Sequence, residues 1–295
     1  MTIAAGFVVR DGVLLCADTL YTPGGAKLPG AKIVASEIPC GKVIFAFAGN
    51  ADFAQATIQK CLGSLRRKTP EQLATNAAIA AIVEKVLDSE YRRLVYNRPD
   101  RDQGTHDFRL LLACWNSSEE MASLYTSYET SIKACEEYDC FGAGYYLGNY
   151  LIRPMFHPTM STEEAQIIAT YAVARAKEYV EGCGDRTNIV TLKHDGTING
   201  ISWTETEPLE RALKGFDARV RVLLFGLLTQ TDMNFYRALQ LFNDTVGDIR
   251  VQLGLDDKGR FRQIQQMQSL FTNLEVQSTP ESTTPDPQFP PASQE

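Results

Sequence analysis

Residues 2–18 of the 295-residue chain read TIAAGFVVRDGVLLCAD, and this stretch decides the fold. Residues 3–9 are apolar, Asp11-Gly12 is a dipeptide that favours a tight turn with positive φ, and residues 13–17 are apolar again. Two apolar strands joined by such a turn form a β-hairpin. The sequence therefore predicts that the chain opens with a hairpin.

The next stretch predicts a loop and two more strands. Residues 22–30 are rich in Pro and Gly, which is typical of a loop. Residues 32–34 and 43–47 are apolar, β-leaning runs on either side of Pro39-Cys40-Gly41. This part of the chain therefore continues the β-structure that the hairpin begins.

Two helices are predicted after these strands. Asn50 or Asp52 can cap a helix that runs to about residue 67. The run Thr69-Pro70-Glu71-Gln72 combines an N-cap candidate, Pro at the first helical position and Gln three residues after the cap. This pattern predicts a second helix that continues to about residue 96.

The following part returns to strands, with one helix between them. Apolar, β-leaning segments lie at residues 108–115 and 121–127, and also at 188–193 and 198–201. A further strand is predicted to end at residues 141–144. Ser161-Thr162-Glu163-Glu164 opens a helical pattern that ends near Gly182. The order of elements favours an α+β sandwich over a repeated βαβ unit.

The composition changes twice along the chain. Residues 1–203 carry the patterns described above and form the predicted main domain. Residues 204–275 mix long polar and apolar segments and are predicted to be mainly helical, with Arg219-Val220-Arg221-Val222 as an alternative strand. Residues 276–295 are rich in Ser, Thr, Pro and Gln, so we expect a disordered tail.

Charge and composition exclude several classes of protein. Lys and Arg number 29 and Asp and Glu 36, so the net charge is −7, which disfavours nucleic acid and anionic membranes as partners. The sequence shows neither a long apolar run nor a secretory signal pattern, which predicts a cytoplasmic protein. Three scattered histidines and seven cysteines without a C-x-x-C pair predict buried reduced thiols, no metal and no cofactor.

Thr2 can supply both a nucleophile and a base once Met1 is removed, as the small second residue permits. Its free α-amino group would titrate near roughly 7.7–8.0 and could accept the proton of its own hydroxyl. A neighbouring ammonium keeps that amine neutral, and a carboxylate holds the ammonium in place. Lys32 and Asp18 can fill these two roles, and the backbone N–H of Gly49 can stabilise an oxyanion.

Each of these residues also has a purely structural explanation. A threonine after an initiator methionine is common, Asp18 can be a turn residue at a strand end, and Lys32 can be a solvated strand end. Gly49 can simply provide backbone freedom in a turn. Cys16 is a weaker candidate nucleophile because it lies in an apolar strand. Only the coincidence of the four residues favours chemistry.

Residues 2–18, Lys32-Ile33-Val34 and the run FAGNAD at 47–52 together resemble the N-terminal part of proteasome β-type subunits and their bacterial relatives among the N-terminal nucleophile hydrolases. The resemblance fits the order of elements through about residue 201. It implies a four-layer αββα sandwich, a threonine peptidase mechanism and homo-oligomeric rings. The family's nucleophile, aspartate, lysine and oxyanion glycine fall on Thr2, Asp18, Lys32 and Gly49.

The resemblance also implies which residues line the substrate cleft: Tyr21, Thr22, Phe47 and Ala51. Thr22 and Ala51 would act there through backbone groups, and Tyr21 and Phe47 suggest an apolar pocket. The interval from Asp18 to Lys32 is shorter than in the family, which leaves Lys27 as a rival to Lys32.

Two stretches depart from the family pattern. Gly142-Ala143-Gly144 stands where the family has Gly-Ser-Gly, whose serine helps to hold the α-amino group. The family's later Asp-x-x-Ser-Gly falls near residues 182–187, where Asp185 and Thr187 would serve as supporting residues after a local shift of the alignment.

The sequence thus predicts a threonine-type endopeptidase that acts on peptides or unfolded proteins. It is expected to form a homo-oligomeric ring, with an ATPase as a possible partner. Three alternatives stay open. Ala143 favours a catalytically inactive ring subunit, which would assemble without hydrolysing peptides. An N-terminal nucleophile amidase would act on a small-molecule amide. In a binding module, residues 204–275 would dock a partner, and their deletion would leave peptidase activity intact.

Overall fold

A computed structural model of the chain describes residues 2–22, 26–97 and 106–228, together with positions 240, 243–244, 246–247 and 250. Its first two strands, β1 (Ile3–Val9) and β2 (Gly12–Asp18), pair antiparallel across the Asp11-Gly12 turn. The predicted opening hairpin is therefore confirmed.

The strands of the described residues form two five-stranded antiparallel sheets and a short ribbon. The first sheet has the order β10 (Tyr138–Gly142), β1, β2, β11 (Thr187–Lys193) and β12 (Ile198–Ile201). The second has the order β5 (Ile33–Ile38), β6 (Gly41–Gly49), β7 (Phe108–Asn116), β8 (Met121–Tyr128) and β9 (Ser131–Cys135). The ribbon pairs β3 (Leu20–Tyr21) with β4 (Leu28–Pro29), so the predicted loop at 22–30 contains a strand.

Alternation along the central strands explains why their sequences are apolar throughout. In β2, Leu14 and Cys16 face one core, whereas Val13, Leu15 and Ala17 face a second core. The second core also receives the alternate residues Ile44, Ala46 and Ala48 of β6, and it therefore lies between the two sheets. The other residues of β6 face a third core: Val43, Phe45 and Phe47. Both faces of these strands are buried, as a continuous apolar run requires.

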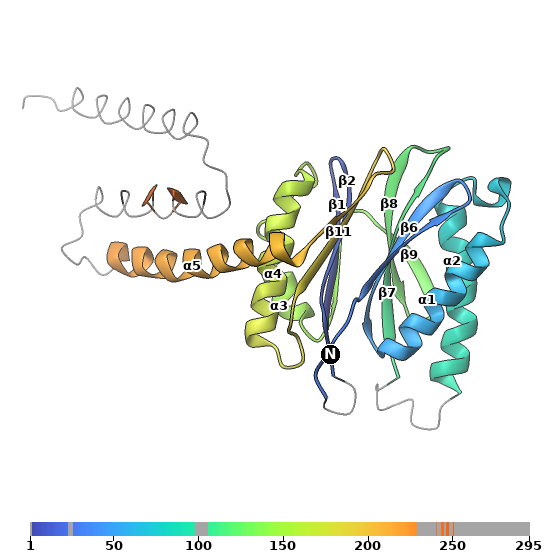
Figure 1. Cartoon of the computed structure of the whole chain (residues 1–295), viewed down its shortest axis with the longest axis horizontal. Helices are drawn as coiled ribbons and strands as arrows, with labels where there is room; N and C mark the ends of the chain where they lie inside the picture. Colours follow the sequence, from blue (N-terminus) through green and yellow to red (C-terminus); the bar gives the residue numbers. More distant parts are fainter. Residues whose placement is uncertain are drawn as a thin grey trace, which may run out of the picture.

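Helices cover the outer face of each sheet (Figure 1). The helices α1 (Ala51–Arg66) and α2 (Asn76–Tyr91) share a core with β6 and β7. The helices α3 (Tyr145–Ile152) and α4 (Thr162–Tyr179) lie beside the sheet that contains β1 and β2, and α4 supplies most of the helical side of that core. The fold is therefore mixed α/β, with antiparallel sheets.

Two caps form where the sequence predicts helix starts. The Asn50 side chain accepts a hydrogen bond from the backbone N–H of Phe53 and caps α1. Ser161 and Glu164 form a reciprocal capping box at the start of α4. Both caps satisfy backbone donors that a helix leaves unpaired in its first turn.

The second predicted helix begins later than its sequence suggests. The Thr69 capping box opens only a 3₁₀ turn, Pro70–Leu73. The α2 helix itself starts at Asn76, because the Thr75 hydroxyl accepts a hydrogen bond from the N–H of Ala78. It ends at Tyr91, and the π-helical turn Arg92–Tyr96 follows. The predicted start near residue 69 is therefore wrong, whereas helical structure does continue to Tyr96, with its last turn π-helical.

No pattern in the sequence predicts the helix α3. Its eight residues, YYLGNYLI, are rich in aromatic residues, and the helix has no side-chain cap at Gly144. Tertiary packing stabilises it instead: a Cβ on Gly148 would lie 2.6 Å from Cys140 Sγ, so the helix sits directly on β10. Local propensity carries no signal for such a helix.

The predicted helical character of the C-terminal part holds for α5 (Trp203–Leu228), which includes the residues 219–222 that were an alternative strand. Its first turns bury Thr206, Leu209 and Glu210 against the body of the molecule. Most of the predicted extension beyond residue 228, and the whole tail 276–295, lie outside the described residues. Among the described helices, none combines the length and apolarity that a bilayer span needs.

Candidate active site

Three strand ends bring the predicted catalytic side chains together. Thr2 precedes β1, Asp18 ends β2 and Lys32 precedes β5. In the hairpin register Ala4 lies opposite Ala17, so the start of β1 runs alongside the end of β2. As a result, the backbone N–H of Ile3 donates a hydrogen bond to Asp18 Oδ1 over 3.0 Å. The hairpin thereby fixes the distance between the first two of these residues.

Lys32 connects Thr2 to Asp18. Its Nζ donates hydrogen bonds to Thr2 Oγ1 over 2.6 Å and to Asp18 Oδ1 over 2.9 Å. Thr2 is 3% exposed, and Asp18 and Lys32 are 0% exposed. Lys27, the rival suggested by the sequence, is exposed. In the structure it is therefore Lys32, and not Lys27, that contacts Thr2.

Both carboxylate oxygens of Asp18 are fully engaged. Besides Lys32 and Ile3 on Oδ1, two backbone N–H groups donate to Oδ2: Leu20 over 3.3 Å and Gly184 over 3.0 Å. A buried carboxylate is tolerated when an opposite charge and further hydrogen bonds compensate its desolvation. These four donors hold Asp18 in one orientation, and with it Lys32.

The buried position changes the acidity of the Lys32 ammonium. Burial lowers the pKa of Lys32 below its usual value of 10.5, and the attraction of Asp18 acts in the opposite direction. Lys32 therefore releases a proton more readily than a surface lysine does. Beside it, burial raises the pKa of the Cys183 thiol to about 12, so this thiol stays protonated at neutral pH and is a poor nucleophile. All seven cysteines are free, and five of them are buried.

The turn Gly142-Ala143-Gly144 wraps around the carbonyl group of Thr2. The N–H of Gly144 donates to the Thr2 carbonyl oxygen over 3.3 Å. Gly142 has a φ of 97°, and a Cβ there would lie 2.2 Å from the same oxygen. Only glycine fits this close approach without strain. Ala143, between the two glycines, is exposed.

Gly49 lies at the exposed end of β6, where α1 is about to begin. Its φ is 97°, and a Cβ would lie 2.3 Å from the carbonyl oxygen of Asp107. The preceding residue, Ala48, lies close to the turn at Gly142. A Cβ added to Gly142 would lie 3.1 Å from the Cβ of Ala48. The end of β6 thus reaches the same region as Thr2.

Of the predicted cleft residues, Tyr21 approaches the Thr2 cluster most directly. Its ring centroid lies 5.3 Å from Lys32 Nζ and 6.3 Å from the ring of Phe47, on which it stacks. Its hydroxyl donates to the carbonyl oxygen of Ala31 over 2.6 Å. Phe47 is only 1% exposed and belongs to the core under α1, so Tyr21 covers it.

The other two predicted cleft residues lie at element ends. Thr22 follows β3 and is half-buried. Ala51 is the first residue of α1 and packs against the core under that helix.

The side chains of the two predicted supporting residues, Asp185 and Thr187, form hydrogen bonds with Thr19 and Glu210. The Asp185 carboxylate accepts a hydrogen bond from Thr19 Oγ1 over 2.7 Å. Thr187 lies opposite Asp18 in the pairing of β2 with β11, but its hydroxyl donates to Glu210. The hydrogen bond from the Gly184 N–H to Asp18 could not be predicted from the sequence, because every residue except proline carries a backbone N–H.

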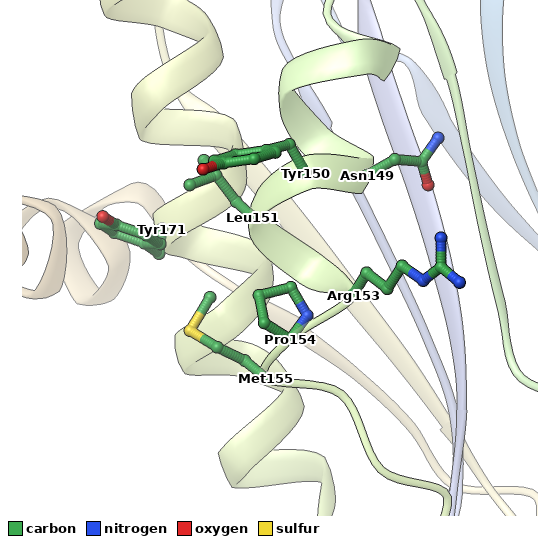
Figure 2. A pocket seen from close by; sticks show the side chains of 7 residues that line it. All are labelled: Asn149, Tyr150, Leu151, Arg153, Pro154, Met155 and Tyr171. Carbon is green, nitrogen blue, oxygen red and sulfur yellow. The ribbon is translucent and has the colours of Figure 1, made fainter.

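A groove of about 780 Å³ lies elsewhere, on α3, the turn after it and α4. Figure 2 shows Tyr150, Met155 and Tyr171 among the side chains around it. None of the predicted site residues lines this groove.

Comparison with known proteins shows the fold. No protein-family model matches the chain, and no curated protein matches it. Among solved structures, a mutant of Anbu from Hyphomicrobium sp. strain MC1 has a TM-score of 0.64 at 14% identity, with 79% of this chain and 99% of that chain covered. Anbu from Yersinia bercovieri, described as an ancestral beta-subunit, has a TM-score of 0.62 at 13% identity over the same shares. The chain thus shares the fold of Anbu, which agrees at a coarse level with the proteasome-like fold that the sequence predicts.

Proposed function

We propose that this protein is an N-terminal threonine hydrolase of the proteasome β type, which cleaves peptide bonds through an ester on Thr2. One observation carries the proposal: Lys32 Nζ lies 2.6 Å from Thr2 Oγ1 and pairs with Asp18 in a buried site. A buried ion pair aimed at a hydroxyl is costly to build for structural reasons alone, which favours a role in chemistry.

The proposed reaction begins after removal of Met1. The free α-amine of Thr2 takes the proton of Oγ1, directly or through water, and Oγ1 forms a bond to the carbonyl carbon of the peptide. The N–H of Gly49 stabilises the resulting oxyanion. When the intermediate collapses, the C–N bond breaks and the leaving amine takes the proton from the α-ammonium. Water then attacks the ester by the same route and releases the acid.

Lys32 and Asp18 tune this chemistry in the proposed mechanism. The Lys32 ammonium stabilises negative charge on Oγ1 as its proton leaves, and it disfavours protonation of the α-amine. Asp18 keeps the ammonium in place.

We also propose a four-layer architecture for the hydrolase domain and assign its boundaries in the sequence. The three cores, one between the sheets and one under each pair of helices, support a four-layer αββα sandwich over residues 1–203. We further propose a cytoplasmic homo-oligomeric ring that takes peptides or unfolded proteins and can work with an ATPase. The Tyr21 ring, stacked on Phe47, would form the floor of the pocket beside the scissile bond, with Thr22 and Ala51 along the cleft.

Ala143 supports a second candidate, an inactive ring subunit, and one substitution tests both. Ala143→Ser adds a hydroxyl beside the Thr2 carbonyl turn. We expect it to raise the kcat for a fluorogenic peptide about 2- to 10-fold, because one hydrogen bond contributes about 0.5–1.5 kcal/mol. Ala143→Gly, which adds no hydroxyl, is the control and should give no increase.

Hydrolysis by the natural chain should include unfolded protein as well as short peptide amides. Assembly without any hydrolysis, in the natural chain and in Ala143→Ser, would favour the inactive subunit. Turnover of a small amide alone would favour the amidase. Light scattering that shows only a monomer of 32.8 kDa would count against the ring.

A further inference from the structure

A buried ion pair joins helix α5 to helix α4. Lys177 Nζ of α4 lies 2.6 Å and 2.8 Å from the two carboxylate oxygens of Glu210 of α5. The side chains are 11% and 9% exposed, so both charges are largely withdrawn from water. Such a pair requires precise partners, because loss of either charge leaves the other uncompensated.

Both members of this ion pair also form hydrogen bonds with the segment 184–187. Lys177 Nζ also donates to the backbone carbonyl oxygen of Asp185 over 3.2 Å. The hydroxyl of Thr187 donates to Glu210 Oε1. Glu210 therefore holds the segment directly at Thr187 and, through Lys177, at Asp185.

The segment in turn holds Asp18. The N–H of Gly184 donates to Asp18 Oδ2 over 3.0 Å. Thr19, the next residue after Asp18, donates its N–H to the Arg186 carbonyl oxygen over 3.0 Å. Two hydrogen bonds thus tie segment 184–187 to the end of β2: one from the Gly184 backbone to the Asp18 side chain, and one between the backbones of Thr19 and Arg186.

The backbone of this segment also needs support. Asp185 has a φ of 59°, a left-handed conformation that is uncommon for a residue with a side chain. Such a conformation persists only where its surroundings determine it, and here Lys177 holds the carbonyl group of the same residue.

We propose that Glu210 is a positioning residue for the site: through Lys177 and Thr187 it fixes segment 184–187, so that the Gly184 N–H stays on Asp18 and Asp18 stays on Lys32. This inference rests on the proposed function for its catalytic consequence, but the contact that it assigns exists independently of catalysis. It makes the first turns of α5 part of the hydrolase unit, although the sequence places them in an extension.

The experiment compares Glu210→Ala with Glu207→Ala in the full-length protein. Glu207 lies on the same helix and pairs with Arg211 at the surface, so the control removes a carboxylate of the same helix that does not touch segment 184–187. Glu210→Gln keeps the volume and an acceptor for Thr187, and it serves if Glu210→Ala does not fold. All variants are assayed well below their melting temperatures.

Two readouts are taken. Hydrogen exchange of peptides that span residues 183–188 should become about 10-fold faster or more in Glu210→Ala and stay unchanged in Glu207→Ala. The kcat for peptide hydrolysis should fall about 10- to 100-fold in Glu210→Ala with KM within about 2-fold, because a misplaced group costs rate more than binding. Glu210→Gln should lie between the two.

The outcomes separate the two proposals. Unchanged exchange in Glu210→Ala would overturn the positioning role whatever the activity. Faster exchange with a kcat equal to that of Glu207→Ala would overturn it as well. If the natural chain hydrolyses nothing, the proposed function fails, and the exchange result alone decides whether Glu210 holds Gly184 on Asp18.

Discussion

Thr2→Ala is expected to lower peptide hydrolysis by about 10⁴-fold or more while the fold remains intact. The substitution removes Oγ1, which is the proposed nucleophile, but it leaves the pairing of Lys32 with Asp18 in place. The measurement is kcat at saturating peptide, together with a thermal melt of each variant.

The matched control for this prediction is Thr2→Ser. It keeps both a hydroxyl and, after removal of Met1, an α-amine, so it should retain substantial activity. Undiminished hydrolysis in Thr2→Ala would show that another residue is the nucleophile and would contradict the proposed mechanism.

Asp18→Asn is expected to destabilise the protein by about 3–5 kcal/mol and to abolish hydrolysis. It removes the counter-charge of a fully buried ammonium, and an uncompensated buried charge has a cost of that size. Lys32→Met should have a similar effect for the opposite reason, because it leaves the Asp18 carboxylate buried without its cation. Denaturant melts of the two variants measure the loss.

The double variant separates stability from catalysis. Asp18→Asn with Lys32→Met buries no net charge, so it should recover much of the lost stability and still hydrolyse no peptide. Wild-type stability in Asp18→Asn alone would contradict the buried ion pair. Activity in the double variant would contradict its proposed role.

The pH dependence of the Asp18→Asn deficit follows from the acidity of Lys32. Burial already lowers the pKa of Lys32 below 10.5, and removal of Asp18 takes away the attraction that opposes this shift. Between the lowered pKa of the folded state and the ordinary pKa of the unfolded chain, the unfolded chain binds more protons, so stability rises with pH. The deficit of Asp18→Asn should therefore be largest below the Lys32 pKa of the folded variant, and it should shrink as the pH rises to the Lys32 pKa of the folded wild-type protein, which itself lies below 10.5. Denaturant melts of both proteins over this range of pH measure the change.

The sequence predicts well what depends on short-range pattern. The Asp11-Gly12 turn and the apolar runs around it specify the hairpin, and the hairpin register alone brings Thr2 close to Asp18. The proximity of Lys32 follows only from the family resemblance, since no local pattern relates β5 to the hairpin.

Features that depend on tertiary contacts are not predictable in this way. The α3 helix forms because Gly148 lets it pack on β10, although its aromatic residues favour a strand. The resemblance implies that Asp185 and Thr187 are supporting residues. Their side chains contact Thr19 and Glu210, and no local pattern marks either contact. Glu210 itself is distant in sequence from Asp18, and the link between them passes through the backbone N–H of Gly184, which no residue pattern marks.

The most direct test of the account is the intact mass of the mature protein before and after reaction with an epoxyketone or a β-lactone. We expect the mass without Met1, and after reaction one inhibitor per chain, bound to the peptide that begins with Thr2. Active protein that retains Met1, or an adduct on any other residue, would contradict the claim that Thr2 acts with its own α-amine.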